Sequence, residues 1–256
     1  MTKKKVWIVG GATTGMYANM FRDRGWTVVS EIDDADLIQF TGGEDVSPSY
    51  YNELRHPHTG CNPIRDQKEA DIYKWAVAAG IPMAGICRGG QFLNVMNGGK
   101  MWQHVDGHAN GNLHKAFALG HIGWVDVTST HHQMMRVNTQ VEHLTLMTAK
   151  ESTSRENMGG AGVVVKHTDT AGKFIDDVES VYYPNTLTLC YQPHPEFYGP
   201  EVTPCRDVYF YFINNYLMNE LNVEDAVTLS KQAWSFKDQK EEELDKSNPF
   251  KMNEVE

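Results

Sequence analysis

One cysteine of this chain lies where a nucleophile could be held. Cys87 falls between an apolar run at residues 81–86 and a run of helical character at residues 91–97. Gly85 and Gly89 stand two residues to either side of it, and a tight strand-to-helix turn needs small residues at those positions. The backbone of Cys87 would then lie at a helix N-terminus, which favours the thiolate over the thiol.

A helix terminus by itself does not make a cysteine a working catalyst. An ordinary cysteine has a pKa of roughly 8.5, which leaves only a few per cent of thiolate at neutral pH. A helix N-terminus contributes at most ~2 kcal/mol, or roughly 1.5 pKa units, and offers no group that could protonate a leaving amine. A nucleophilic cysteine should therefore be paired with a histidine, and that histidine with an acidic residue that orients it.

Residues 192–196, with the sequence Gln-Pro-His-Pro-Glu, supply both partners. In an extended segment, residues two apart point to the same side, so His194 and Glu196 can face one another across the proline between them. The two prolines also restrict the backbone around the histidine. A strand is expected at residues 186–191, and it would deliver the pair to the edge of a sheet. Together with Cys87, this segment predicts a Cys-His-Glu triad.

These motifs resemble those of class I glutamine amidotransferases. From about residue 5 to residue 217 the chain is similar to their γ-glutamyl hydrolase-like branch, which includes the γ-glutamyl-GABA hydrolases. The blocks that carry the resemblance follow the family order, and they are residues 41–48 with Tyr51, residues 65–69, residues 85–99, residues 129–133 and residues 192–196.

The resemblance implies a role for each residue of the candidate catalytic centre. Cys87 would attack the side-chain amide carbonyl of a γ-glutamyl group and form a γ-glutamyl thioester. His194 would transfer the proton, and Glu196 would hold the imidazole. The backbone N–H groups of Gly43 and Arg88 would form an oxyanion hole, in which one donor is typically worth ~3–4 kcal/mol.

The resemblance also implies contacts with the substrate and requires no cofactor. Gln91, Ser129, His131 and His132 would contact the α-amino and α-carboxylate end of the substrate, and Tyr51 belongs to the family's substrate loop. Gln91 could instead be an ordinary helix residue, and residues 129–132 could serve only a turn. The residue before the catalytic histidine is usually a large aromatic in the family but is Pro193 here, which leaves the choice of substrate open.

The elements that must position these residues form an α/β pattern. Alternating strand-like and helix-like segments up to about residue 99 predict a mainly parallel central sheet with helices on both faces. The resemblance implies a fold of this kind, the flavodoxin-like three-layer α/β/α fold, and we expect a small antiparallel extension before the strand at residues 186–191. The ligand should lie at the carboxyl ends of the parallel strands. The expected strands are residues 6–10, 27–32, 37–40, 123–128, 162–167 and 179–183, and the expected first and last helices are residues 14–24 and 206–217.

One helix of the family pattern is missing. Only residues 33–36 separate two expected strands where the family has a covering helix.

Two further patterns suggest other kinds of site. His104, Asp106, His108, His114 and His121 are close in sequence, but their spacing matches no zinc pattern, so we expect active-site loops and no metal. Residues 10–15 are rich in glycine and follow a strand, yet they lack the spacing of a nucleotide-binding loop. We expect a tight turn near the active site.

Composition excludes several classes of protein. The chain has 256 residues, 41% of them hydrophobic, and a formal net charge of −10; its mean hydropathy is −0.47. An acidic chain is not a general nucleic-acid binder, and no apolar run approaches the ~20 residues of a membrane span. No segment resembles a signal peptide, and four cysteines without regular spacing suit a reducing compartment. We expect a cytoplasmic protein.

One domain with a C-terminal extension is expected. Residues 1–218 would form the amidotransferase-like domain, and residues 219–256 an acidic C-terminal extension that is partly disordered or docks a partner. Trp234 and Phe236 in this extension could pack on the domain or serve a partner or a homodimer.

Two versions of the chemistry remain open. The protein could hydrolyse γ-glutamyl amides by itself, or it could be a glutaminase subunit that delivers ammonia to a separate synthetase chain. A non-catalytic binding protein on the same fold would be expected to lack a member of the triad. A cysteine protease or chaperone with a related turn would lack both the Gly-Gly loop at residues 42–43 and the His-Pro-Glu block.

Overall fold

The centre of the molecule is a nine-stranded mixed sheet with the order β2-β1-β3-β4-β14-β13-β10-β7-β8. The computed structural model describes residues 3–10, 15–119, 123–150, 152–159, 161–168 and 177–218, together with residue 228. In sheet order, the strands are β2 (Thr27–Val28), β1 (Lys5–Ile8), β3 (Leu37–Phe40), β4 (Met83–Ile86), β14 (Thr188–Tyr191), β13 (Asp177–Tyr183), β10 (Leu144–Ala149), β7 (Leu113–Ala118) and β8 (Gly123–Thr128).

The sheet has a parallel half and an antiparallel half. The strands from β2 to β14 pair in parallel, and those from β14 to β8 pair antiparallel. The predicted parallel sheet and antiparallel extension are thus confirmed, although the extension is larger than expected. It continues the main sheet and adds two small sheets.

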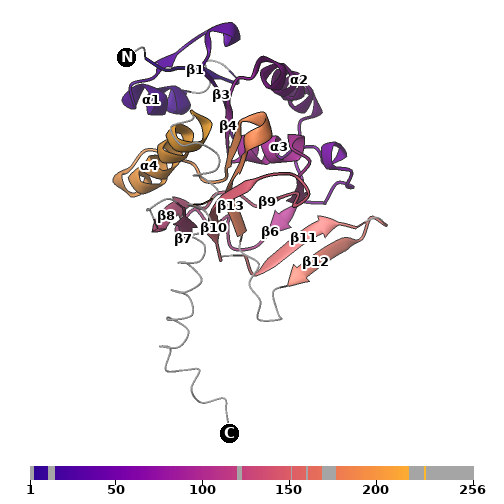
Figure 1. The fold of residues 1–256 in the computed structure, drawn as a ribbon. Helices are drawn as coiled ribbons and strands as arrows, with labels where there is room; N and C mark the ends of the chain where they lie inside the picture. The colour runs from indigo at the N-terminus through magenta and orange to yellow at the C-terminus, as the bar shows by residue number, and fades with distance from the viewer. Residues whose placement is uncertain are drawn as a thin grey trace, which may run out of the picture.

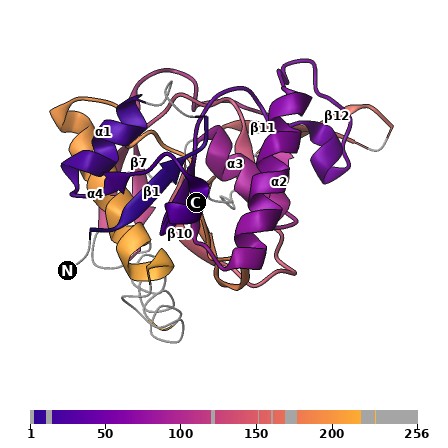
Figure 2. The ribbon, with the colours of Figure 1, turned by 90° about the horizontal axis from the view of Figure 1, so that it is seen from above.

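Helices cover both faces of the parallel half, as the sequence pattern predicts. Helix α1 (Gly15–Asp23) and helix α4 (Thr203–Phe212), which continues as a π-helical turn (Ile213–Leu217), lie on one face. Helix α2 (Pro63–Ala79) and helix α3 (Arg88–Met96) lie on the other. Figures 1 and 2 show the two pairs on opposite sides of the strands. The fold is therefore a three-layer α/β/α arrangement.

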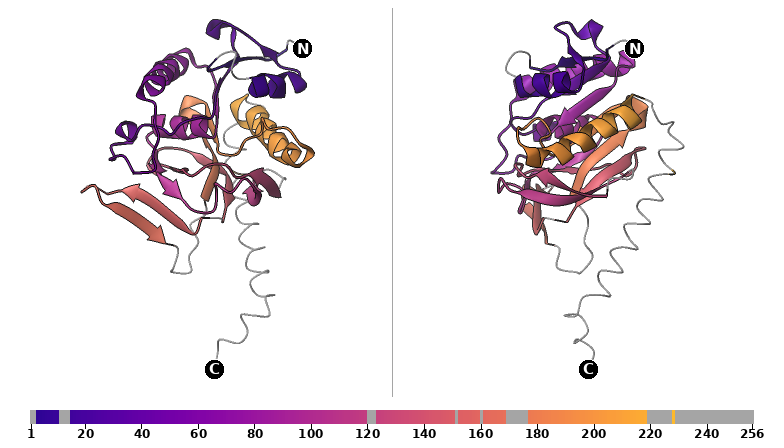
Figure 3. Two further views of the ribbon diagram at one scale, coloured as in Figure 1. Left: turned by 180° about the vertical axis from the view of Figure 1, so that it is seen from behind. Right: turned by 90° about the vertical axis from the view of Figure 1, so that its left-hand side faces the viewer.

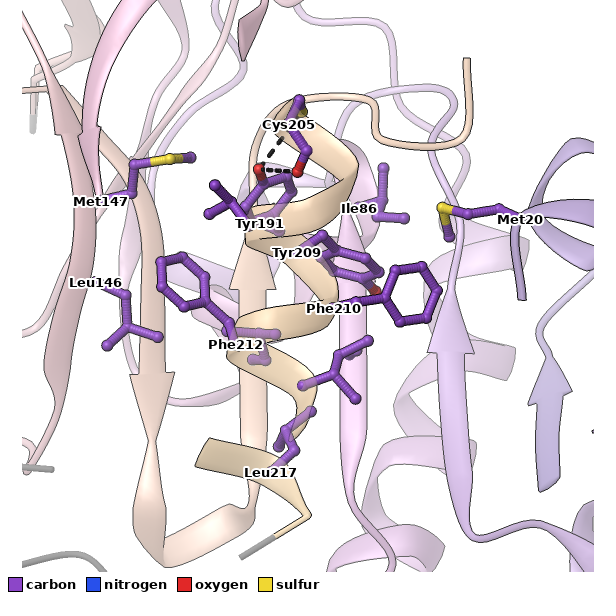
Figure 4. Close-up of a cluster of buried hydrophobic side chains, with 14 of the residues drawn as sticks. Met20, Ile86, Leu146, Met147, Tyr191, Cys205, Tyr209, Phe210, Phe212 and Leu217 are labelled. Carbon is purple, nitrogen blue, oxygen red and sulfur yellow. Dashed lines mark hydrogen bonds between the residues drawn. The ribbon is translucent and has the colours of Figure 1, made fainter. Parts of the chain in front are cut away.

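Alternation along the strands divides the apolar residues between two cores. Successive side chains of a strand point to opposite faces. Leu37 accordingly belongs to the core under α1 and α4, while its neighbour Ile38 belongs to the core under α2 and α3. Figure 4 shows the first of these cores, in which Tyr209 and Phe212 of α4 lie over the sheet.

The two small sheets lie beyond the main sheet. One contains β6 (His104–Val105), β11 (Ser154–Met158) and β12 (Val164–Thr168), and the other pairs β5 (Lys100–Trp102) with β9 (Met134–Arg136). The hairpin of β11 and β12 projects from the body of the molecule (Figure 3).

Several expected boundaries differ from those of the structure. Strand β2 ends at Val28 rather than near residue 32, and only a 3-10 turn, η2 (Ile32–Asp34), precedes β3. The missing helix of the family pattern is thus replaced by this short turn. Residues 11–14 of the expected glycine turn, His121, and residues 219–256 apart from residue 228 lie outside the described residues. Within the described part, no helix is both long enough and apolar enough to cross a membrane.

Candidate active site

Cys87 occupies a strained corner between β4 and α3. Its backbone has φ 51° and ψ −115°, a region that residues other than glycine seldom adopt. Two backbone hydrogen bonds hold the corner: Cys87 N–H donates to the Tyr191 carbonyl at 2.8 Å, and the Cys87 carbonyl accepts from Gln91 N–H at 2.9 Å. Such strain is expected where a turn must project one side chain outward.

Close backbone contacts explain the glycines around the corner. A Cβ atom on Gly85 would lie 2.4 Å from the Gly89 carbonyl carbon, and one on Gly89 would lie 2.6 Å from the Phe40 carbonyl oxygen. Neither backbone can move without disrupting the parallel strands. The small flanking residues predicted from the sequence are therefore required by sterics.

His194 reaches the cysteine because β14 and β4 are neighbours. Tyr191 and Ile86, the last residues of these parallel strands, are paired, so the segments that follow them leave the same edge of the sheet. A Cβ atom placed on Gly42, in the loop after β3, would lie 3.2 Å from Cε1 of His194 and 3.7 Å from Cβ of Cys87. Residues far apart in sequence thus converge beside this loop.

Glu196 and two other neighbours hold the imidazole of His194. Nδ1 of His194 lies 2.6 Å from Oε1 of Glu196, its ring stacks on Phe197 with centroids 4.5 Å apart, and its backbone N–H donates to the Thr128 hydroxyl at 2.6 Å. Burial of the ring opposes its protonation, but hydrogen bonds with Cys87 and Glu196 outweigh burial and raise the pKa of His194 to about 10. The protonated form of the ring is therefore favoured at neutral pH.

The two residues predicted to form an oxyanion hole, Gly43 and Arg88, lie in the loop after β3 and at the start of α3. Gly43 has φ +141°, and a Cβ atom there would lie 2.2 Å from Nη1 of Arg65, so only glycine fits. The N–H of Gly42 donates to the Tyr17 hydroxyl at 2.9 Å and is not available to a ligand. Arg88 opens α3, in the first turn where N–H groups have no intrahelical partner.

Buried charged side chains of α2 connect the Gly-Gly loop with the start of α3. The Arg88 guanidinium pairs with Asp66 and Glu69, and all three side chains are buried. Glu69 also accepts from Nε of Arg65 at 2.7 Å. Arg65 in turn donates to the carbonyl oxygens of Thr41 and Gly42 at 2.9 and 3.0 Å. The block at residues 65–69 thus ties the Gly-Gly loop and the start of α3 to one helix.

A cavity of about 290 Å³ opens beside Cys87. Its walls come from the Gly-Gly loop, the first turns of α3 and the loop between β8 and β9. The lining residues include Cys87, Gly43, Gln91, Thr130, His131 and His132. The cavity lies at the carboxyl ends of the parallel strands, where a ligand was expected.

Three of the five predicted substrate residues line this cavity. The amide of Gln91 is positioned by hydrogen bonds to the Gln133 carbonyl and to Oε1 of Gln192, both at 3.1 Å. Nε2 of His132 lies 3.1 Å from Oδ1 of Asp45, and this hydrogen bond raises the pKa of His132. His131 also lines the cavity, but its Nδ1 faces the Gln133 carbonyl at 3.0 Å, and burial lowers its pKa to about 3.

Tyr51 and Ser129 lie apart from the cavity lining. Tyr51 ends the 3-10 turn η3 (Pro48–Tyr51) and is buried in the core under α2 and α3. The hydroxyl of Ser129 is buried and donates to the His108 carbonyl at 2.8 Å. Both side chains are turned inward, so contact with a substrate would require rearrangement.

The histidine-rich segment was expected to form active-site loops, but part of it forms strands. His104 lies in β6 and His114 in β7. His108 and His114 are buried, and each contacts an acidic residue of β13. His114 shares the buried face of β7 with Ala116 and Ala118, a pattern that the wide spacing of the histidines does not reveal.

Tyr17 contacts the candidate site but was not predicted from the sequence. It lies on α1, and its hydroxyl accepts from Gly42 N–H at the back of the Gly-Gly loop. Burial, followed by the charge of Glu196, raises its pKa far above the ordinary value, so the phenol stays protonated. No sequence signal marks it, because a tyrosine on an amphipathic helix is an ordinary core residue.

A second and larger cleft lies on the other side of the Gly-Gly loop. It has a volume of about 620 Å³ and is lined by residues of β1, the Gly-Gly loop and α2, among them Trp7, Tyr17, Gly42, Arg65 and Ile72. Glu44 lines both this cleft and the cavity beside Cys87.

Several known proteins are similar to this chain in sequence. A Mycobacterium tuberculosis protein named "Putative glutamine amidotransferase Rv2859c" is 30% identical over 184 residues, which are 64% of this chain and 52% of that protein. A Lactococcus lactis subsp. cremoris protein named "Putative glutamine amidotransferase-like protein YvdE homolog" is 36% identical over 105 residues, 36% of this chain and 56% of its own length. The chain spans about half the length of the curated relatives it matches.

A solved structure and a family model extend the comparison. The structure, from Thermoplasma acidophilum and described as a "putative gmp synthase subunit a protein", matches with a TM-score of 0.54 at 18% identity, over 84% of this chain and 94% of that one. At this identity the match shows the fold alone. Residues 21–196 match the family model described as Peptidase C26. Because that match covers well over half of the sequence, the chain belongs to the Peptidase C26 family, within the class I glutamine amidotransferase-like proteins.

Proposed function

We propose that the protein hydrolyses γ-glutamyl amide bonds through a γ-glutamyl thioester on Cys87. The observation that carries the proposal is the convergence of Cys87, His194 and Glu196 at the carboxyl ends of two adjacent parallel strands. The thiolate is the attacking form of a cysteine, and a neighbouring imidazole can take up and return its proton.

The chemistry proceeds in two balanced steps. In the first, the thiolate attacks the amide carbonyl, the C–N bond breaks, and His194 gives its proton to the departing amine or ammonia. In the second, His194 takes a proton from water, the hydroxide attacks the thioester, and glutamate leaves as the sulfur is released. Glu196 keeps the same nitrogen of His194 protonated throughout, so the other nitrogen faces the reacting atoms.

The polar groups around the cavity suit the two ends of a γ-glutamyl substrate. We assign the backbone N–H groups of Gly43 and Arg88 to the developing oxyanion. We assign Gln91, Thr130 and His132 to the α-amino and α-carboxylate groups, since these residues line the cavity with Cys87. Tyr51, Ser129 and His131 were predicted to share this task. Tyr51 and Ser129 lie apart from the lining, and His131 lines the cavity with its Nδ1 held at the Gln133 carbonyl.

A second version of this function is favoured by the larger cleft. The cleft shares Glu44 with the cavity as a lining residue and could receive a segment of another chain. The structural neighbour from Thermoplasma acidophilum is described as a GMP synthase subunit. In this version, the protein releases ammonia from glutamine to a separate synthetase.

Glutamate release tests both versions. Wild-type protein and Cys87→Ala would be incubated with glutamine and with a panel of γ-glutamyl amines. Turnover of the conjugates with little turnover of glutamine supports the independent hydrolase, and turnover of glutamine alone supports the ammonia-donating subunit. Cys87→Ala should lose activity by at least ~10³-fold, the scale seen when a nucleophile is removed. Equal turnover by Cys87→Ala would rule out the thioester.

A further inference from the structure

A cluster of two histidines and one glutamate lies buried behind the wall of the cavity. His108 follows β6, His131 lies between β8 and β9, and Glu179 belongs to β13. Their exposed fractions are 0%, 4% and 0%. One nitrogen of each histidine and one carboxylate oxygen of Glu179 lie within 4.8 Å of one another. We refer to these three residues as the His-His-Glu cluster.

Hydrogen bonds outside the cluster define which nitrogen of each histidine carries hydrogen. Nε2 of His108 lies 2.9 Å from a carboxylate oxygen of Asp177, and Nδ1 of His131 lies 3.0 Å from the Gln133 carbonyl. Both partners are acceptors, so both of these nitrogens must donate. In a neutral imidazole the other nitrogen then carries a lone pair. The lone pairs belong to Nδ1 of His108 and Nε2 of His131.

Three acceptors of the cluster are left without a donor. No described residue hydrogen-bonds to Nδ1 of His108, Nε2 of His131 or Oε2 of Glu179. Nδ1 of His108 is 3.7 Å from Oε1 of Glu179, and that oxygen also receives Nε2 of His114 at 3.1 Å. Buried acceptors this close together need a shared donor or a cation between them.

We infer that the His-His-Glu cluster binds a divalent transition-metal ion. Imidazole nitrogen and carboxylate oxygen are the ligands from which zinc sites of the two-histidine, one-glutamate type are made. The carboxylate of Asp177 and the Gln133 carbonyl orient the two histidines in the way that outer groups commonly orient metal-bound imidazoles. This site would tie the loop of Thr130 and His132, which lines the cavity, to strand β13.

The inferred ion is separate from the proposed catalytic chemistry. None of its three inferred ligands belongs to the candidate triad, and its existence does not depend on the proposed function. It departs from the expectation that the histidine-rich segment holds no metal. That expectation considered only neighbours in sequence, whereas two of the three ligands, His131 and Glu179, lie outside the segment.

Metal content and zinc affinity test the inference on the full chain. Protein stripped with a chelator would be titrated with zinc against a competing indicator, and the bound metal would be measured by mass spectrometry. We expect about one equivalent of zinc per chain and much weaker binding of Mg²⁺, which prefers oxygen ligands. Glu179→Gln and His131→Gln should lose most of this binding, and Asp177→Asn should weaken it by about 10- to 100-fold.

A histidine outside the cluster provides the matched control. His143, whose Nδ1 also faces a backbone carbonyl, that of Val141 at 2.7 Å, should be replaceable by glutamine with no change in zinc affinity. If the cluster variants do not fold, cobalt added to the wild-type protein is the second measurement. Visible absorption of a histidine- and carboxylate-ligated cobalt ion would support the site. A folded wild-type chain that takes up no stoichiometric zinc or cobalt would overturn the inference, as would folded cluster variants that bind zinc like the wild type.

Discussion

His194 is the side chain whose protonation decides whether the candidate triad can act. Its pKa of about 10 results from hydrogen bonds with Cys87 and Glu196 that outweigh the effect of burial. The imidazolium is therefore the dominant form across the neutral range. Activity that depends on it should decline only as the pH rises toward that pKa.

Glu196→Gln should move the alkaline limit of activity to lower pH. The substitution removes one of the two hydrogen-bonding partners that raise the pKa of His194, so the imidazolium deprotonates at lower pH. The logarithm of kcat/KM plotted against pH from 6 to 10.5 measures the shift. Glu201→Gln, at an exposed acid in the same region of the chain, is the control and should leave the profile unchanged. An unmoved alkaline limit in Glu196→Gln would show that Glu196 does not control His194.

Gly43→Ala should abolish most activity with less effect on folding. A Cβ atom at this position meets Nη1 of Arg65 at 2.2 Å in a backbone with φ +141°, so the loop must shift and carry its N–H away from the cavity. Loss of one oxyanion donor typically lowers kcat by about 10²–10³-fold. Steady-state kinetics and thermal melting would be compared with Gly15→Ala, where a Cβ atom meets no neighbour. Wild-type kcat in Gly43→Ala would remove Gly43 from the proposed oxyanion hole.

At the scale of elements, helix α2 holds together the parts that bear the site. Its Asp66 and Glu69 share the buried guanidinium of Arg88, and burial lowers the pKa of Arg88 only to about 10, so the pair remains ionic at neutral pH. Removing one partner of a buried ion pair leaves the other charge buried without compensation. The buried ion pairs of Arg88 should therefore stabilise the position of α3 more than an ion pair at the surface stabilises the segments it joins.

Arg88→Met should lower the free energy of unfolding by about 3–5 kcal/mol. Arg24 provides a matched comparison, since it pairs with Asp207 at the surface with exposed fractions of 36% and 57%. Arg24→Met should cost no more than about 1 kcal/mol. Urea denaturation of the two variants at pH 7 measures both values. Similar losses in both would mean that burial does not set the strength of the Arg88 pairs.

At the scale of the whole molecule, the described core closes with the helical segment that ends at Leu217. Leu217 and the neighbouring Tyr216 are buried in the core under α1 and α4. All four cysteines are free. The cytoplasmic location, the homodimer and the separate C-terminal extension stay predictions.

A chain that ends at Met218 should fold as the longer chain does. The described core residues end at Leu217; if residues 219–256 form a separate extension, as the sequence predicts, cooperative thermal unfolding should stay within about 4 °C of the full chain, which corresponds to roughly 1 kcal/mol. Calorimetry and light scattering of both chains would be compared. Aggregation or a much lower melting temperature would show that residues 219–256 pack on the domain, and a change from dimer to monomer would assign them to an interface.

Local patterns made part of this protein readable from its sequence. The corner at Cys87 and the pair His194 and Glu196 depend on residues only a few positions apart, and so do strands such as β3 and β8, whose bounds agree with expectation. Burial of alternate or helically spaced side chains leaves a trace along the chain itself. The family resemblance added roles for residues that such patterns cannot assign.

Contacts between distant segments were decided only by the tertiary structure. The sequence contains no sign that Tyr17 would reach Gly42, that Tyr51 and Ser129 would turn inward, or that His108, His131 and Glu179 would meet. Each depends on strand order and on which face of an element is covered, and these follow from the packing of all elements together. A side chain's type predicts what it can do, but its neighbours in space decide which of those things it does.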